Sequence, residues 1–293
     1  MEKAILKTLI YADIFDYPLT VFEIHKWLIG KKATLRQVEK TLYKLSRESR
    51  VKSQGEYYYL PRRSKLVSKR LRCGQQSLIY FRKAKMLSQI LKLIPWVKLV
   101  GISGGLALNS ASKKDDIDLF IIISKNRLWV SRLFIIGLFS LIGQRRKKGD
   151  QGRKIAGKFC INILLEEDKL EQQNKDIFIA HELLQMKPLW FRGGIYSKYL
   201  LDNEWVFKSL PNWIGNASQE LRIMNYESRR KHKNRNSLIS LLESFAKWFQ
   251  LKIMQQSRGM ERIEDGALYF HPKDCRRGVL SKYKQRVSFI ISP

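Results

Sequence analysis

The sequence predicts an α+β protein with a helical N-terminal unit, a central mixed sheet and a helical C-terminal region. Apolar residues recur at helical spacing through the first 46 residues, and a short hairpin pattern follows them. Two apolar runs, at 98–102 and 119–123, flank a glycine turn and indicate neighbouring strands. From residue 169 onward the apolar spacing is again mostly helical. The expected domain boundaries are 1–72, 73–168 and 169–293.

Three helices and a hairpin are expected in the N-terminal unit, at 2–15, 21–29, 35–46 and 51–60. Thr20 and Glu23 have the spacing of a capping box at the start of the second helix, and Thr34 is a suitable N-cap for the third. This order resembles a winged helix, in which the third helix enters the major groove of DNA and the hairpin contacts the backbone. The alternative is a winged helix that docks a protein domain and binds no nucleic acid.

Between residues 62 and 168 the pattern predicts the elements that surround the central strands. A basic stretch, 62–72, merges into a helix at 75–93, and an apolar helix at 127–142 is expected to cover the sheet. The polar, basic loop at 144–158 precedes a further strand at 159–165, and we expect this loop to reach a bound substrate. Beyond residue 168 we expect helices at 176–186, 196–202, 237–254 and 276–290, and a dense basic run at 225–236.

The chain is strongly basic for a folded protein. Its 293 residues include 56 Lys or Arg and 26 Asp or Glu, a formal net charge of +30. A hydrophobic fraction of 44% with 11% aromatic residues is typical of a globular chain and excludes a disordered one. Such a charge attracts polyanions, so nucleic acid is the first expected partner and an anionic membrane surface the second. A proteome-wide basic bias or simple solvation would give the same charge.

Cysteine usage and hydropathy indicate a cytoplasmic protein without an integral membrane segment. Cys73, Cys160 and Cys275 are far apart, and their spacing matches neither a zinc site nor a disulfide framework. No signal peptide pattern opens the chain. The most apolar run, 133–143, is about half as long as a bilayer-spanning helix and is expected to be buried.

The stretch from 99 to 124 carries the chemistry. Side chains alternate along a strand, so Asp116 and Asp118 are expected to project from the same face. Two neighbouring carboxylates repel each other unless a cation lies between them, and oxygen ligands suit Mg²⁺. Gly104 and Gly105 allow backbone N–H groups to approach a bound anion. A metal-binding acid pair beside an anion cradle suits a nucleoside triphosphate.

This stretch resembles the nucleotidyltransferase superfamily with the DNA polymerase beta fold. Gly104-Gly105, a spacer of ten residues, and Asp116-Ile117-Asp118 before an apolar strand match its pattern of Gly-Ser, spacer and Asp-x-Asp. The resemblance implies that Asp116 and Asp118 hold Mg²⁺ and that Ser103, Gly104 and Gly105 position the triphosphate of an NTP. It also implies two-metal, in-line attack of an acceptor hydroxyl on the α-phosphate, with pyrophosphate as the leaving group.

Two departures from the family pattern support an alternative function. Gly105 stands where the family has serine, and a third carboxylate is not evident on the strand at 159–165. The polar candidate there is Asn162, an amide, while Glu166 or Glu167 just past the strand could substitute. The alternative is therefore a catalytically inactive protein of this fold that binds nucleic acid through its winged helix and basic surface.

Further segments resemble bacterial nucleotidyltransferase-domain proteins with an N-terminal winged helix. They are Tyr11 to Thr20, Glu182 to Leu189, Asn203-Glu204-Trp205, Leu210-Pro211-Asn212 and Phe270-His271-Pro272. With the central stretch they extend over nearly the whole chain. That group is defined by its domain arrangement, and the resemblance indicates neither the acceptor nor the NTP.

Overall fold

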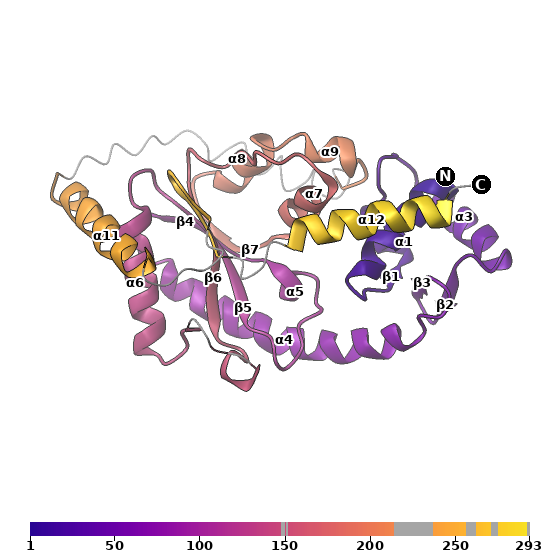
Figure 1. The fold of residues 1–293 in the computed structure, drawn as a ribbon, viewed down its shortest axis with the longest axis horizontal. Helices are drawn as coiled ribbons and strands as arrows, with labels where there is room; N and C mark the ends of the chain where they lie inside the picture. Colours follow the sequence, from indigo (N-terminus) through magenta and orange to yellow (C-terminus); the bar gives the residue numbers. More distant parts are fainter. Residues whose placement is uncertain (148–149, 151, 214–236, 256–261, 271–274, 292–293) are drawn as a thin grey trace.

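A six-stranded sheet and a smaller N-terminal unit lie at opposite ends of the molecule, joined by two long helices (Figure 1). The computed structural model describes residues 1–147, 150, 152–213, 237–255, 262–270 and 275–291. The first joining helix, α4 (Lys65–Leu91), begins ten residues before the expected start at residue 75 and takes in most of the basic stretch. The basic run at 225–236 and His271 lie outside the described residues.

The N-terminal unit has the helices and the hairpin that the sequence predicts. Its helices are α1 (Glu2–Ile14), α2 (Val21–Lys26) and α3 (Leu35–Arg47). Its strands are β1 (Leu19–Thr20), β2 (Lys52–Gln54) and β3 (Tyr57–Tyr59), antiparallel in the order β1-β3-β2. Thr20 and Thr34 both form capping boxes, so both predicted helix starts are confirmed. The second helix ends at Lys26, three residues earlier than expected.

The central sheet is mixed, as the sequence predicts. Its order is β7-β4-β5-β6-β9-β8, and only β5 and β6 run parallel among the strands that the structure describes. The strands are β4 (Val97–Ile102), β5 (Ile117–Ile123), β6 (Phe159–Glu166), β7 (Lys187–Phe191), β8 (Arg262–Glu264) and β9 (Ala267–Tyr269). The sequence did not predict β7, β8 or β9, which come from the region beyond residue 168.

Two hydrophobic cores lie on the two faces of this sheet. On one face pack α4, α6 (Leu128–Leu141) and α11 (Ser237–Gln255). On the other face pack α7 (Ile177–Gln185), α8 (Ile195–Leu201) and α9 (Val206–Ser209). Alternate residues of β5 divide between them: Ile121 belongs to the first core and Phe120 to the second. Among the described helices, none is long and apolar enough to cross a bilayer.

The last helix, α12 (Cys275–Ile291), returns along the molecule and packs against α1, so the two ends of the chain lie together (Figure 1). Arg286 Nη1 lies 2.5 Å from Asp13 Oδ2. A second link comes from Asn212, whose side chain accepts from Ala33 N and donates to His25 O. Segments far apart in the sequence therefore fix the N-terminal unit against the central sheet.

Candidate active site

Asp116 and Asp118 lie at the beginning of β5, in the middle of the sheet. Ile117 and Leu119 are buried in the core below α4 and α6, so the two acids project from the opposite face, as predicted. One ligand atom from each of Asp116, Asp118 and Cys160 can be chosen so that all three lie within 4.8 Å of one another. The two carboxylates are therefore close enough to share one cation.

Cys160 occupies the place where the sequence analysis looked for a third acid. The parallel pairing of β5 with β6 sets Cys160 beside Asp118. The register then shifts, since Leu119 pairs with Ile161 but Phe120 pairs with Ile163. Asn162 falls at this irregularity and donates from Nδ2 to the buried Ser103 Oγ over 3.0 Å. Alternation along the strand at 159–165 places Cys160 on the same face as Asn162. The sequence does not show that this strand pairs with the one that carries Asp118.

Glu166 and Glu167 do not complete the acid pair, so the expectation that one of them substitutes is wrong. Glu166 pairs with Ile123 at the far end of β5. Five residues of strand, roughly 17 Å, separate that end from Asp118. Glu166 Oε1 accepts from Arg127 N over 3.2 Å, and Glu167 Oε1 accepts from Lys125 N over 3.3 Å. Both acids stabilise the turn before α6.

The glycine bend lies directly against Asp118. Ser103 N donates to Asp118 O over 3.0 Å, and Gly104 then adopts φ +61°, a left-handed conformation that favours glycine. A Cβ on Gly104 would lie 2.6 Å from Asp118 Oδ2. A Cβ on Gly105 would meet nothing nearer than 3.9 Å, so the missing serine leaves open space there. The helix after the bend, α5 (Gly104–Ala107), is a single turn.

A cationic side chain of the protein already pairs with Asp116. Arg146 Nη1 lies 2.5 Å from Asp116 Oδ2 and 3.9 Å from Cys160 Sγ. Arg146 comes from the polar loop at 144–158, and its backbone N donates to Phe159 O. In the part of that loop that the structure describes, Arg146 therefore lies against the acid pair.

Burial and mutual repulsion disfavour the charged forms of the acidic groups in this site. Burial first, and then Asp116, raise the pKa of Asp118 well above its usual range, while Arg146 opposes them. Burial and the two acids raise the pKa of Cys160 to about 12, so its thiol stays protonated and is no ligand for Mg²⁺. The spacing of the two carboxylates fits such an ion.

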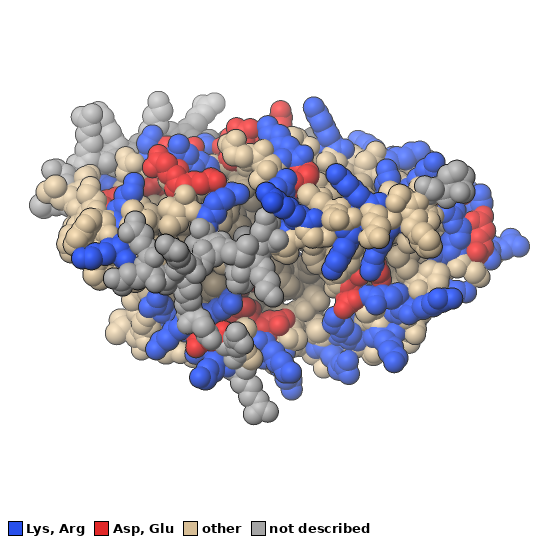
Figure 2. Space-filling view, in the orientation of Figure 1, with Lys and Arg blue, Asp and Glu red and all other residues tan. Residues whose placement is uncertain are grey.

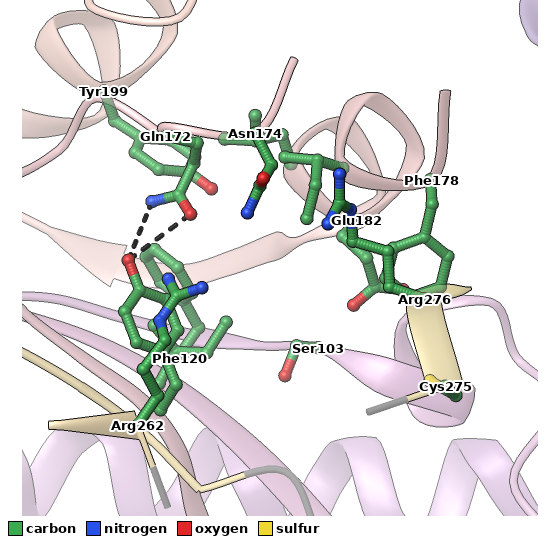
Figure 3. A pocket seen from close by; sticks show the side chains of 14 residues that line it. Ser103, Phe120, Gln172, Asn174, Phe178, Glu182, Tyr199, Arg262, Cys275 and Arg276 are labelled. Atoms are coloured by element: carbon green, nitrogen blue, oxygen red, sulfur yellow. Dashed lines mark hydrogen bonds between the residues drawn. The ribbon is translucent and has the colours of Figure 1, made fainter. Parts of the chain in front are cut away.

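A cavity of about 300 Å³ opens on the same face of the sheet, and Ser103 forms part of its wall. Figure 3 shows Ser103 and Glu182 on one side and Gln172 and Arg262 on the other. Phe120 contributes an apolar wall. This cavity could not be predicted from the sequence, because Glu182 is only one polar residue on a predicted helix.

Two polar groups on the cavity wall lack a protein partner. Among the described residues, neither the Glu182 carboxyl nor the Tyr199 hydroxyl has a hydrogen-bond partner. Burial raises the pKa of Glu182 to about 7. Buried polar groups are normally hydrogen-bonded, so an open cavity with two unpartnered groups is suited to a polar ligand.

No family model, curated protein or solved structure matches this chain. The chemistry of the site is therefore inferred from its own geometry.

Proposed function

We propose that this chain is a Mg²⁺-dependent nucleotidyltransferase that moves a nucleotidyl group from an NTP to an acceptor hydroxyl. The observation that carries the proposal is the placement of Asp116 and Asp118. Both acids project from one end of one strand, and the bend at Gly104 has no room for a side chain against Asp118. An acid pair beside a bare backbone bend is what binding of a metal triphosphate requires.

Each residue has a distinct role in this proposal. Asp116 and Asp118 hold the divalent ion, which when bound supplies charge stabilisation for phosphoryl chemistry. Gly104 and Gly105 let the triphosphate approach the backbone, and the open space at Gly105 leaves room for it. Arg146 exchanges its partner when the ion binds: its guanidinium leaves Asp116 and pairs with phosphate oxygens.

The cavity is the proposed place of the acceptor. Ser103 belongs both to the glycine bend and to the cavity wall, so a ligand in the cavity lies next to the triphosphate. Glu182 and Tyr199 would hydrogen-bond the acceptor, and Phe120 would pack against its apolar part. A volume of about 300 Å³ suits a small molecule or the end of a larger one.

The proposed domain types follow the sequence resemblance. We infer that the central sheet is a nucleotidyltransferase core and that the N-terminal unit is a winged helix. Support comes from the mixed sheet carrying the acids on β5 and from three helices followed by the β2–β3 hairpin.

A catalytically inactive, nucleic-acid-binding protein is the second candidate. It is favoured by Cys160 in place of a third acid and by the ion pair between Arg146 and Asp116. It is also favoured by the exposed basic side chains Arg36, Lys40 and Arg47 on α3. In this reading α3 would contact the nucleic acid.

Transfer of label from α-³²P-labelled NTPs separates the two candidates. The assay contains Mg²⁺ and, as acceptors, RNA and a cell metabolite extract. We expect the wild type to transfer label and Asp116→Ala/Asp118→Ala to lose at least about 100-fold in rate, the usual scale for loss of metal catalysis. Asp115→Asn is the matched control, because Asp115 bonds Ser112 rather than joining the acid pair. Transfer that survives the double substitution would overturn the proposal.

A further inference from the structure

Helix α11 leaves an arc of large apolar side chains facing solvent. Leu241 is 68% exposed, Phe245 61% and Trp248 58%. Leu242, Phe249 and Ile253 are exposed as well. An amphipathic helix normally buries such an arc, and contiguous exposed apolar patches mark interaction surfaces.

The arc faces outward because α11 is anchored by its opposite side. Ala246, Gln250 and Met254, spaced four residues apart, are buried against the sheet unit. Gln250 Nε2 donates to Trp129 O over 2.7 Å. Glu243 accepts from Trp129 N and Val130 N, which places its carboxylate at the first turn of α6. These polar contacts fix which side of the helix is exposed.

The same end of the molecule carries more exposed apolar surface. α6 lies beside α11 (Figure 1) and exposes Leu133, Phe134 and Leu141. The ring of Phe134 packs edge-on against Trp96. Exposed apolar side chains therefore occur on both of these neighbouring helices.

We propose that this surface, the exposed arc of α11 with the neighbouring apolar side chains of α6, docks onto an anionic lipid bilayer. The arc itself contains no acid among its described side chains, and Lys252 lies within it with Nζ 5.4 Å from the centre of the Trp248 ring. Aromatic and branched aliphatic side chains flanked by lysine are typical of helices that lie in the bilayer interface. The ammonium group can reach lipid phosphates while its stem stays with the rings.

The net charge of the chain favours an anionic bilayer over a second copy of this chain as the occupant of this surface. A second copy of this chain would carry the same net charge of +30 and would be repelled, whereas an anionic bilayer attracts it. Lys and Arg are spread over the visible face of the molecule, with acids in a few small groups (Figure 2). RNA is also attracted by the positive charge, but its bases stack on aromatic rings. The exposed aliphatic side chains Leu241, Leu242 and Ile253 would not contribute to such stacking.

Co-sedimentation with vesicles tests the proposal. The probes are vesicles of phosphatidylcholine with one quarter phosphatidylglycerol, and vesicles of phosphatidylcholine alone. We expect the full chain to sediment with the anionic vesicles, and Phe245→Ser/Trp248→Ser to bind at least about tenfold more weakly. Phe22→Ser/Phe289→Ser is the matched control, since it removes two exposed rings elsewhere and should bind as the wild type does.

A second variant keeps the test independent of folding. Lys252→Glu places an acid in the arc at an exposed position and should weaken binding to the anionic vesicles only. Unchanged vesicle binding by both α11 variants would overturn the proposal. The proposal would also be overturned if self-association, measured by light scattering, or RNA binding depended on the arc and vesicle binding did not. None of these measurements involves nucleotide transfer.

Discussion

Asp118 is the residue around which the candidate site is arranged. Its backbone carbonyl accepts from Ser103 N, its carboxylate fills the space left by Gly104, and its strand partner is Cys160. The sequence predicted the two acids and the bend, because both follow from local spacing. It could not predict Cys160, because the pairing of β5 with β6 depends on a strand more than thirty residues away.

The contact between Gly104 and Asp118 predicts a contrast between adjacent glycines. Gly104→Ala should cost roughly 1–2 kcal/mol from its left-handed conformation and should also push the Asp118 carboxylate aside. We expect a lower melting temperature and weaker divalent-ion binding. Gly105→Ala is the control and should leave both nearly unchanged, because its Cβ has space. Equal effects of the two substitutions would contradict the described bend.

The ion pair between Arg146 and Asp116 predicts that a divalent ion must displace the guanidinium to bind the acids. In Arg146→Gln an incoming ion no longer displaces a guanidinium, so we expect its Kd to fall roughly 3- to 10-fold, equal to about 1 kcal/mol of pairing. Without metal this variant should melt at a lower temperature, because Asp116 and Asp118 then repel each other. Isothermal titration with Mn²⁺ measures the affinity, with Arg145→Gln as the control. Weaker Mn²⁺ binding by Arg146→Gln would be the opposite result.

At the scale of elements, helices with local start signals were predictable and short strands were not. Thr20 and Thr34 fix the starts of α2 and α3 through side-chain contacts three residues away. β7 follows a helix directly and contains Pro188, a residue that argues against a strand in the sequence. β8 and β9 have three residues each, and they form a pair in which β9 binds the edge of β6. Their existence depends on the sheet rather than on their own sequence.

The contacts of Glu243 predict that α11 stabilises the first turn of α6. Its two carboxylate oxygens accept from Trp129 N at 2.7 Å and Val130 N at 3.0 Å, like an N-cap supplied by another helix. Glu243→Ala should cost about 1 kcal/mol and speed hydrogen exchange in the first turn of α6. Ser244→Ala, at the exposed neighbouring position, should not. Unaltered exchange at Trp129 and Val130 in Glu243→Ala would show that the contact contributes nothing.

At the scale of the whole molecule, the N-terminal unit is joined to the central sheet by a buried, partly aromatic interface. His181 of α7 stacks on Tyr11 of α1, with ring centres 4.1 Å apart, and lies near Trp27. Asn212 adds hydrogen bonds to the segment between α2 and α3. Tyr11 and Asn212, which are about 200 residues apart in the sequence, therefore both help to hold the two parts together. Sequence spacing could not reveal this role.

Buried His181 in this interface predicts a pH-dependent contribution to stability. Burial lowers the pKa of His181 to about 3. On acidification the unfolded chain therefore binds a proton at this residue near pH 6.5, whereas the folded chain does not. The contribution of His181 is complete above pH 6.5 and is lost as the pH falls, by about 3 kcal/mol at pH 4.5. Glu182 acts oppositely between pH 4.5 and 7, since its pKa is raised to about 7.

Urea unfolding of the wild type and of His181→Phe at pH 7 and pH 4.5 isolates this effect. The difference between the two proteins should shift in favour of His181→Phe as the pH falls, because the contribution of Glu182 is common to both. A difference that does not change with pH would mean that His181 is protonated in the folded chain.

Divalent-ion binding is the most direct test of the proposed site. Electron paramagnetic resonance measures free Mn²⁺ in the presence of the wild type, of Asp118→Asn and of the control Asp115→Asn. We expect Mn²⁺ binding by the wild type and by Asp115→Asn, and a loss of at least about tenfold in affinity in Asp118→Asn, which removes one of two charged ligands. Equal Mn²⁺ affinity in Asp118→Asn and the wild type would contradict the proposed site.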